Sequence, residues 1–562
     1  MKVVIVGGVA GGASAAARIR RRDETAEIVM FEKTGYISYA NCGLPYYIGG
    51  SIADEEDLTL QTPESFRQRF RVDVRVLHEV TAIHPEKKTV SVTDLRTGKQ
   101  SEESYDKLLL STGAKPTRPP LPGLDNDRVF TLRTVEDTLA IKAFIDRKKP
   151  RRAVVIGGGF IGLEMAENLR HNPLDVTLIE YADHLLAPLD ADMAAAVHTE
   201  MKANGVHLLL KTAVTALEAD KDGILVRTSA DTIPTDMVLL CVGVTPDTAL
   251  AAAAGLKLGI RNSIAVNAQM QTSVPDIYAV GDAVQVRHFV SGEDALVSLA
   301  GPANKQARIA ADNICGHPAS YDGAQGSSVI KVFDMTVATT GIKEEQAARL
   351  GLPYDKVVLS PMSHASYYPG GRVMTIKLLF RTDTQQILGA QILGYEGVDK
   401  RIDVLATAIR AGMKVTSLCE LELSYAPPYS SAKDPVNMAG YIAENLLSGM
   451  VKQFHYEDLP ALLQNKDVFL LDTRTPAEYA KGHVEGFVNI PLDELRERLQ
   501  ELPAGRPVYV MCQSGLRSYL ACRILAGNGI DCYNFSGGYR FYDILRKGGA
   551  LPTEAYPCGM NR

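Results

Sequence analysis

Two cysteines stand in contexts that suit chemistry at sulfur. Cys42 lies in the glycine- and proline-rich stretch YISYANCGLPYYIGG, and Cys512 lies in VMCQSGLRS. The eight cysteines form no CxxC pair, so the sequence indicates neither a disulfide framework nor a structural zinc site, and we expect no bound metal. Because the thiolate is the reactive form of cysteine, both are candidate nucleophiles; the alternative for Cys42 is a buried, inert thiol.

Two segments share one strand, turn, helix and strand pattern. Lys2–Val6 enters GGVAGG, followed by a small-residue helix and a strand at Ile28–Phe31. Arg152–Ile156 enters GGGFIG, followed by a helix over Leu163–Arg170 and a strand at Val176–Ile179. A glycine-rich turn lets the backbone approach a pyrophosphate at a helix N-terminus. The sequence therefore predicts two dinucleotide sites.

An acid that could bind a ribose follows each turn. Glu32 and Glu180 stand about 20 residues after the last glycine of their turns, as the dinucleotide fingerprint requires. The second turn has all three glycines, whereas Val9 replaces the middle one in the first. The residues expected at the two turns are Gly7, Gly8, Gly11, Gly12 and Glu32, and then Gly157, Gly159, Gly162 and Glu180.

The C-terminal part has an α/β pattern of its own. We expect strands at Val468–Leu471 and Val508–Met511 and helical stretches at Asp493–Leu502 and Ser518–Asn528. With 562 residues the chain is too long for one core, so several domains of the α/β class are expected.

Composition and charge exclude several classes of partner. The net charge is -6, and neither the C-terminal part nor the rest carries the basic excess that binds nucleic acid through phosphates. No apolar run approaches the roughly 18 residues that a membrane span needs, and the apolar start is divided by glycines, unlike a signal peptide. We expect a cytoplasmic protein without a nucleic-acid or membrane partner.

Further motifs accompany Cys42. They are STGAKP at Ser111–Pro116, CVGVTPDT at Cys241–Thr248 and TSVPDIYAVGDA at Thr272–Ala283. With them, residues 1 to about 445 resemble the pyridine nucleotide-disulfide reductase superfamily of flavoproteins. This resemblance implies FAD at the first turn, NAD(P)H at the second, and a homodimer. It adds Thr112, Gly113 and Asp282 to the FAD site and Gly243 to the NAD(P)H site.

The superfamily's second cysteine is absent, because Tyr47 stands where most members complete CxxxxC. Cys42 must then form a mixed disulfide, a persulfide or a sulfenic acid. The single-cysteine branch contains coenzyme A-disulfide reductases as well as NADH oxidases and peroxidases. The latter carry a histidine in the first glycine-rich turn, where this chain has Ala10. ISYANCGLPYY resembles the coenzyme A-disulfide reductase motif.

That resemblance implies a coenzyme A site near Cys42. The preceding helix carries Arg18, Arg20, Arg21 and Arg22, whose guanidinium groups can bind the phosphates of coenzyme A as bidentate donors. A solvated helix face is the alternative for such a charge run. The residues expected to bind coenzyme A are Ser14, Arg18, Arg21, Arg22, Ser38, Asn41 and Lys433.

Two tyrosines match the same branch, in SHASYYPGG and SYAPPYSSAKDP. By the resemblance, Tyr367 and Tyr425 reach the partner subunit's Cys42, where a phenolic OH can supply a proton to a thiolate. Tyr368 is the alternative to its neighbour, and half-buried packing is the alternative for all three.

The segments Leu470–Leu492 and VMCQSGLRS resemble a rhodanese domain, from about Glu457 to Pro557. In that domain a loop starting at the catalytic Cys512 turns backbone N–H groups inward, which stabilises a thiolate or a persulfide. The spacing to Arg517 is C-x4-R, shorter than the C-x5-R of related phosphatases, and suits sulfur. We expect Tyr539 and Phe541 to pack where many relatives have tryptophan.

These resemblances imply NADH-dependent reduction of coenzyme A persulfide or disulfide, or of polysulfide, with the rhodanese domain relaying sulfane sulfur. NADPH stays possible as reductant. Two alternatives stay open: an NADH oxidase or peroxidase that uses a sulfenic acid, and a sulfurtransferase or sulfur carrier with a regulatory flavoprotein part. The expected domains are FAD-binding, 1–113 and 243–320; NAD(P)H-binding, 114–242; dimerisation, 321–445; a linker, 446–456; and rhodanese, 457–562.

Overall fold

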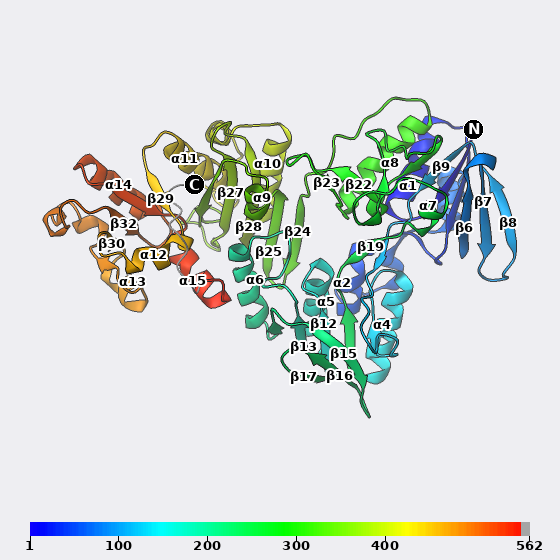
Figure 1. Cartoon of the computed structure of the whole chain (residues 1–562), viewed down its shortest axis with the longest axis horizontal. Helices are drawn as coiled ribbons and strands as arrows, with labels where there is room; N and C mark the ends of the chain where they lie inside the picture. The colour runs from blue at the N-terminus through cyan, green and yellow to red at the C-terminus, as the bar shows by residue number, and fades with distance from the viewer. Residues whose placement is uncertain (552–562) are drawn as a thin grey trace. The chain divides into compact units, whose positions relative to one another are not determined.

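The computed structural model describes residues 1–551 and forms two compact units (Figure 1). The first contains Met1–Asp183 and Gly205–Gly326, and the second contains His184–Asn204 and the chain from Ser327 onward. Residues 552–562, the end of the expected rhodanese range, lie outside the described residues. Within residues 1–551 no helix is both long and apolar enough to cross a membrane.

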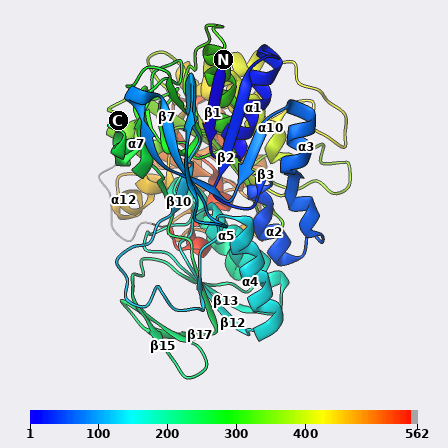
Figure 2. The same cartoon turned by 90° about the vertical axis from the view of Figure 1, so that its right-hand side faces the viewer.

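A parallel sheet forms the core of the first unit's N-terminal part, and Figure 2 shows α1 (Ala10–Arg22) beside it. Its strand order is β21 (Ile277–Ala279), β9 (Lys107–Leu110), β1 (Lys2–Val6), β2 (Glu27–Glu32) and β5 (Asp73–Val76). Strands β1 and β9 are buried almost throughout, as in sheets that are covered on both faces. The strands expected at Lys2–Val6 and Ile28–Phe31 are confirmed.

A second parallel sheet in the same unit repeats the arrangement. Its order is β11 (Val129–Phe130), β18 (Met237–Leu240), β12 (Arg152–Ile156), β13 (Asp175–Ile179) and β14 (His207–Leu209). Helix α5 (Phe160–His171) follows β12 directly, which confirms the second strand, turn and helix pattern. Helix α4 (Val135–Lys148) begins with a capping box in which Thr134 and Asp137 exchange hydrogen bonds.

Smaller elements complete the first unit. Its antiparallel sheets are β6–β7–β8 (His78–His84, Thr89–Asp94, Gln100–Ser104) and β15–β16–β17 (Val214–Ala219, Ile224–Thr228, Thr232–Thr235). Short strands are β3 (Ile37–Tyr39), β4 (Thr59–Gln61), β10 (Ala114–Pro116), β19 (Val244–Pro246), β20 (Ile264–Ala265), β22 (Val284–Arg287) and β23 (Asp294–Ala295). Its other α-helices are α2 (Leu44–Gly49), α3 (Pro63–Phe70), α7 (Ala249–Ala253) and α8 (Ala300–Ile314).

The second unit contains an antiparallel sheet covered by helices. The strand order is β24 (Ser328–Val332), β25 (Met335–Gly341), β28 (Ile387–Gly394), β27 (Thr375–Arg381) and β26 (Tyr354–Leu359). Its helices are α6 (Ala191–Ala203), α9 (Glu344–Arg349), α10 (Val398–Arg410) and α11 (Pro435–Leu447). Every residue of β28 is buried, so this strand forms the centre of the core.

A parallel sheet forms the C-terminal part of the second unit. Its order is β29 (Lys452–Phe454), β33 (Cys532–Phe535), β32 (Val508–Met511), β30 (Phe469–Asp472) and β31 (Val488–Asn489). Its helices are α12 (Leu459–Gln464), α13 (Pro476–Lys481), α14 (Leu516–Gly527) and α15 (Gly538–Gly548). Strand β29 pairs with β33, so the stretch expected as a linker contributes a strand to this sheet.

One expected helix does not form. In place of a helix over Asp493–Leu502 there are two short 3-10 turns, Leu492–Glu494 and Leu499–Glu501. Residues 495–498 separate them, and Arg498 has φ -116°. The spacing of the leucines in this segment is helical, but only Leu495 and Leu502 are buried. A segment this short has little helical stability of its own, so its anchoring in the core decides the conformation.

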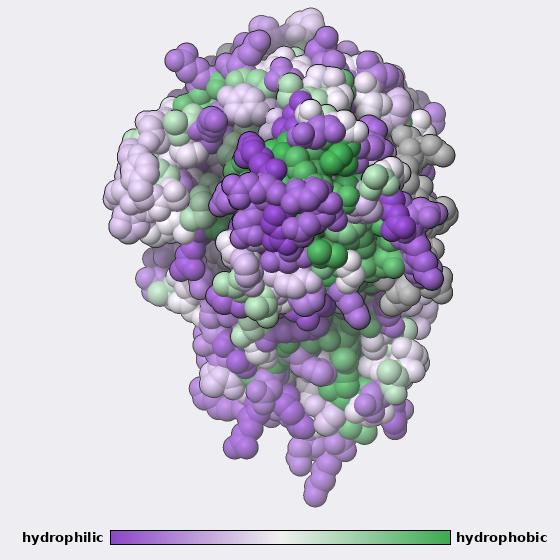
Figure 3. Space-filling view, turned by 90° about the vertical axis from the view of Figure 1, so that its left-hand side faces the viewer, coloured by the Kyte–Doolittle hydropathy of each residue, from purple (hydrophilic) through white to green (hydrophobic). Residues whose placement is uncertain are grey.

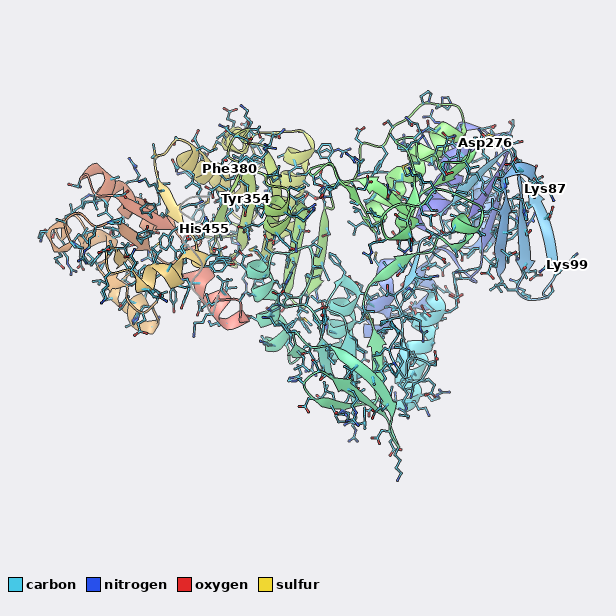
Figure 4. The ribbon with its side chains drawn as sticks, in the orientation of Figure 1. Lys87, Lys99, Asp276, Tyr354, Phe380 and His455 are labelled. Carbon is cyan, nitrogen blue, oxygen red and sulfur yellow. The ribbon has the colours of Figure 1, made fainter. Side chains whose placement is uncertain are left out.

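Buried ion pairs join the C-terminal sheet to the antiparallel sheet of the second unit. The Lys356 Nζ lies 2.6 Å from Glu457 Oε1 and 2.9 Å from Glu344 Oε2. The Lys377 Nζ lies 2.8 Å from Asp192 Oδ2 on α6 and 2.9 Å from Glu344 Oε2. Each buried charge therefore has an opposite charge, which offsets the cost of desolvation. Figure 4 labels Tyr354, Phe380 and His455 in this region.

Candidate active sites

The first glycine-rich turn can hold only glycine at two positions. Gly7 has φ +99°, and an added Cβ would lie 2.2 Å from the Ser111 carbonyl oxygen; at Gly12 it would lie 1.8 Å from the Gly7 oxygen. The buried Glu32 carboxylate accepts a hydrogen bond from the Gly8 N–H at 2.8 Å. The acid at the end of β2 thus lies against the turn, as ribose binding beside a pyrophosphate requires.

The second turn has the same construction. Gly157 has φ +108°, and an added Cβ would lie 2.4 Å from the Cys241 oxygen, while the Glu180 carboxylate accepts from the Gly158 N–H at 2.6 Å. Gly159, the N-cap of α5, has φ -80°, and Val9, the N-cap of α1, has φ -97°. Because both angles are negative, the middle position accepts a β-branched residue, which explains Val9 in the first turn.

The other predicted dinucleotide residues lie at strand ends of the first unit. Thr112 donates through Oγ1 to the Asp247 carbonyl oxygen at 2.6 Å, and Gly113 and Gly243 have φ +68° and +99°. The Asp282 carboxylate lies 3.2 Å from Arg133 Nη2. These residues and both turns fit FAD and NAD(P)H, since each turn combines strained glycines with a carboxylate on its backbone.

Arg133 is a residue that the sequence did not single out. Its guanidinium contacts Asp282, and its Nη1 donates to the Asn41 amide oxygen at 2.9 Å. Asn41 also donates to the Arg133 carbonyl oxygen at 3.2 Å. Asn41, predicted to contact coenzyme A, is thus held by Arg133 next to Cys42. Arg133 lies outside every motif, so no local pattern could have identified it.

Cys42 lies in the 3-10 turn Asn41–Gly43, just before α2, and is exposed. Enough protein surrounds its sulfur that loss of hydration raises the pKa of the thiol, and the charges of Glu164 and Asp282 raise it further. Arg133 acts in the opposite direction. Loss of hydration and the charge of Glu167 raise the pKa of Glu164 to about 7. The thiol therefore lies among groups that favour its neutral form.

A basic pocket of about 400 Å³ opens beside α1. Four residues predicted to bind coenzyme A line it together: Ser14, Arg18, Arg21 and Ser38. Ser38 has φ +46°, an unusual conformation for a residue other than glycine.

The pocket contains cations that the sequence did not reveal. Arg69 on α3 and Arg308 on α8 line it as well. Within residues 1–551, Arg21, Arg69 and Arg308 have neither an ion pair nor a side-chain hydrogen bond. The one sequence feature that connects Arg308 to another pocket residue is its i, i+4 spacing from Asn304, which places both on one helix face. Three unpaired guanidinium groups make this pocket suitable for phosphates.

Not every predicted coenzyme A residue joins the pocket. The Arg22 guanidinium lies 2.7 Å from Asp312, which also binds Arg18 at 2.8 Å, and Arg22 is not among the lining residues. Arg20 is buried and donates to five backbone carbonyl groups, so its role is structural. Lys433 lies exposed in the second unit, and its role stays a prediction.

Tyr367 and Tyr425 meet on the surface of the second unit. Their hydroxyl oxygens are 2.7 Å apart, and the residues are 73% and 47% exposed. The Tyr368 ring instead packs edge-on against His364, with centroids 5.6 Å apart. The geometry favours Tyr367 over Tyr368 as the partner of Tyr425.

Cys512 lies at the end of β32 and is 1% exposed. Its Sγ accepts hydrogen bonds from the Gly515 N–H and the Ser518 hydroxyl, both at 3.2 Å. Gly538 approaches so closely that an added Cβ would lie 2.7 Å from the Cys512 carbonyl oxygen. These donors can stabilise negative charge on this sulfur, as the inward-turned loop predicts.

The Arg517 side chain forms an ion pair with Glu478. Its two terminal nitrogens donate to the two Glu478 oxygens at 2.7 Å each, and Arg517 holds the pKa of Glu478 down at about 2.

The two aromatic residues after the Gly537–Gly538 pair pack as expected. The Arg474 guanidinium lies 4.0 Å from the Tyr539 ring centroid, and Phe541 is buried. Leu516, the first residue of α14, is 59% exposed. Figure 3 shows the left-hand side of the view in Figure 1, where green hydrophobic side chains lie among purple hydrophilic ones.

Comparisons with known proteins agree with this architecture. Residues 1–307 match the pyridine nucleotide-disulphide oxidoreductase model, 327–435 its dimerisation domain and 455–542 the rhodanese-like domain. A coenzyme A disulfide reductase of Staphylococcus haemolyticus is 37% identical over 79% of this chain and 100% of its own length.

Two solved structures match nearly the whole chain. The reduced CoADR-RHD of Bacillus anthracis has a TM-score of 0.95 and 50% identity, covering 97% of this chain and 98% of its own. An NAD-dependent persulfide reductase from A. fulgidus has a TM-score of 0.90 and 37% identity, covering 96% and 100%. With its two dinucleotide turns, dimerisation domain and rhodanese-like domain, this chain belongs to the pyridine nucleotide-disulphide oxidoreductases, a family of flavin- and NAD(P)H-dependent enzymes.

Proposed function

We propose that this enzyme uses NADH to reduce coenzyme A disulfide, coenzyme A persulfide and polysulfide, and that its rhodanese domain supplies sulfane sulfur. The observation that carries the proposal is the pocket with the unpaired arginines Arg21, Arg69 and Arg308. Coenzyme A has a pyrophosphate and a ribose phosphate, which suit several guanidinium donors. Ser38, which lines the pocket, stands four residues before Cys42 in the chain.

The names of the matched relatives agree with this substrate class. The staphylococcal protein is a coenzyme A disulfide reductase, and the A. fulgidus protein is a persulfide reductase that depends on NAD. The chain also keeps a cysteine with two hydrogen-bond donors in its rhodanese domain. A sulfenic-acid oxidase or peroxidase would have no use for that domain.

The proposed chemistry starts at the sulfur of Cys42. Its thiolate attacks the coenzyme A sulfur of the substrate and forms a mixed disulfide between Cys42 and coenzyme A. A disulfide substrate loses a thiol in this step, and a persulfide substrate loses sulfide. The expelled sulfur takes a proton, which the Tyr367 and Tyr425 pair can supply. FAD, which Gly7, Gly12 and Glu32 would hold, would pass on two electrons from NADH. These electrons would reduce the mixed disulfide and release coenzyme A as the second thiol. The balance is RSSR + NADH + H⁺ giving two RSH and NAD⁺.

The dimerisation domain supports a homodimer. In this proposal the two tyrosines act on Cys42 of the partner subunit, and both residues lie exposed on the single chain, where a partner could meet them. The domain ranges given above and a cytoplasmic location belong to the same proposal.

Two arginines of α3 provide a matched test of the pocket. Arg69 lines it, whereas Arg67 pairs with Asp73 at 3.1 Å and does not. A charged hydrogen bond contributes about 1.5–3 kcal/mol, so Arg69→Ala should raise the KM for coenzyme A disulfide about tenfold or more in anaerobic NADH oxidation. Arg67→Ala should leave it unchanged. An equal KM in both variants would refute phosphate binding in this pocket.

The wild-type enzyme decides between the proposed function and its main alternative. Anaerobic NADH consumption with coenzyme A disulfide or polysulfide should greatly exceed consumption with oxygen or peroxide. The opposite order would establish an oxidase or peroxidase.

A further inference from the structure

A buried arginine connects the two loops that carry the tyrosine pair. Arg401 lies on α10 and is 1% exposed. Its Nη2 donates to the Ser363 carbonyl oxygen at 3.0 Å, four residues before Tyr367. Its Nη1 donates to the Gly397 carbonyl oxygen at 3.1 Å, one helical turn before it. The guanidinium group therefore fixes the start of the first tyrosine loop against α10.

The same guanidinium group holds the second loop. Its Nη2 also lies 3.3 Å from the Tyr429 carbonyl oxygen, 3.1 Å from Ser430 Oγ and 2.9 Å from Asp434 Oδ2. The Ser430 hydroxyl donates to the same Asp434 oxygen at 2.6 Å. The Val436 N–H donates to Asp434 Oδ1 at 3.0 Å, and by this bond Asp434 caps α11. The second loop, which carries Tyr425, is thus tied to the same point.

One backbone hydrogen bond joins the loops directly, from the Ala365 N–H to the Ser430 carbonyl oxygen at 2.9 Å. By contrast, the two tyrosines are exposed, Tyr367 more than Tyr425, and contact each other through their hydroxyl groups. Packing therefore does not fix the separation of the two hydroxyl groups. It depends on how the bases of the loops are held.

We infer that Arg401 is a positioning residue for the Tyr367–Tyr425 pair: it sets the hydroxyl geometry that proton supply to the leaving thiolate requires. The inference rests on the proposed function. A lysine cannot replace Arg401, because its side chain is one bond shorter and its single ammonium group cannot bind both the Gly397 carbonyl oxygen, which Nη1 contacts, and the loop acceptors around Nη2. A misplacement of about 1 Å far from the chemistry can cost about 100-fold in rate.

The first test compares Arg401→Lys with Gln391→Ala in the full-length holoenzyme. Gln391 is buried on β28 and binds Asp190, and among the described residues its side chain forms no hydrogen bond to either loop, so its loss should destabilise the unit without moving the tyrosines. Arg401→Lys should lower kcat with coenzyme A disulfide by about 10- to 100-fold and leave KM within threefold. NADH oxidation by ferricyanide, which needs no tyrosine, should stay unchanged. Gln391→Ala should lower the melting temperature but not kcat.

The second test separates positioning from general damage. In the Tyr367→Phe/Tyr425→Phe background, Arg401→Lys should lower kcat by less than threefold, because the groups it positions are gone. A loss as large as in the wild-type background overturns the inference. If Arg401→Lys does not give folded holoenzyme, Ser430→Ala takes its place, with an expected loss of about threefold to tenfold and the same disappearance in the double-Phe background.

A readout without substrate distinguishes this inference from the proposed function. Hydrogen exchange should increase at residues 363–369 and 425–434 in Arg401→Lys and not in Gln391→Ala. Unchanged exchange there overturns the positioning role. If the exchange result holds but wild-type enzyme reduces no disulfide or persulfide, the proposed function fails while the structural role of Arg401 stands.

Discussion

Glu164 makes the stability of this protein depend on pH in a direction that is unusual for a carboxylate. Loss of hydration and the charge of Glu167 raise its pKa from 4.5 to about 7 in the folded chain. Between these values the folded state keeps a proton that the unfolded state has released, so stability decreases as pH rises and levels off above pH 7. At 1.36 kcal/mol per pKa unit, the loss reaches at most about 3 kcal/mol.

Glu164→Gln removes the ionisation and keeps the size of the side chain. The variant should match wild type near pH 4.5 and become more stable than wild type by up to about 3 kcal/mol above pH 7. Thermal unfolding of the holoenzyme, followed by flavin fluorescence from pH 5 to 8.5, measures this difference. Glu79→Gln, at an exposed position on β6, is the control and should show no pH-dependent gain.

The pH dependence is what tests the argument. A gain that is equal at pH 5 and pH 8 would mean that Gln simply packs better than Glu. A variant less stable than wild type at pH 8 would refute a buried, destabilising carboxylate beside Cys42.

Three further predictions concern the reaction. Cys42→Ser should abolish reduction of coenzyme A disulfide and persulfide with FAD still bound. Cys512→Ser should remove sulfur transfer from polysulfide and spare disulfide reduction. If both variants lose disulfide reduction equally, this division of roles is wrong. Because the Glu180 carboxylate lies on the Gly158 N–H and would repel a 2′-phosphate, the kcat/KM for NADH should exceed that for NADPH, and a reversed ratio would contradict the assignment. Cys42→Ser subunits mixed with Tyr367→Phe/Tyr425→Phe subunits should regain about half of the wild-type activity per heterodimer; no recovery after confirmed exchange would place thiol and tyrosines in one chain.

The turns could be predicted from sequence because their requirements are local. Gly7 and Gly157 need positive φ, Gly12 lies against backbone, and each acid follows its strand at a fixed distance along the chain. Such constraints act within about 30 residues, and the strands at Lys2–Val6 and Arg152–Ile156 form as expected.

The phosphate pocket could be predicted only in part, because it is built from distant segments. Arg18 and Arg21 belong to a visible charge run, but Arg69 and Arg308 come from helices far along the chain. Arg22 pairs with Asp312 and does not line the pocket, and no spacing rule connects these two residues. Charge runs show where cations are numerous, while tertiary pairing decides which of them stay available to a ligand.

The surroundings of the two thiols indicate which of them stores sulfur and which releases it. Cys512 is buried with two donors on its sulfur, so negative charge on a persulfide would be stabilised there. Cys42 is exposed, and Glu164 and Asp282 disfavour negative charge on its sulfur. An anionic persulfide would therefore persist at Cys512 and be unstable at Cys42. On the proposed function, this difference favours sulfur transfer out of the rhodanese domain toward the reductase site, where NADH makes the release of sulfide irreversible.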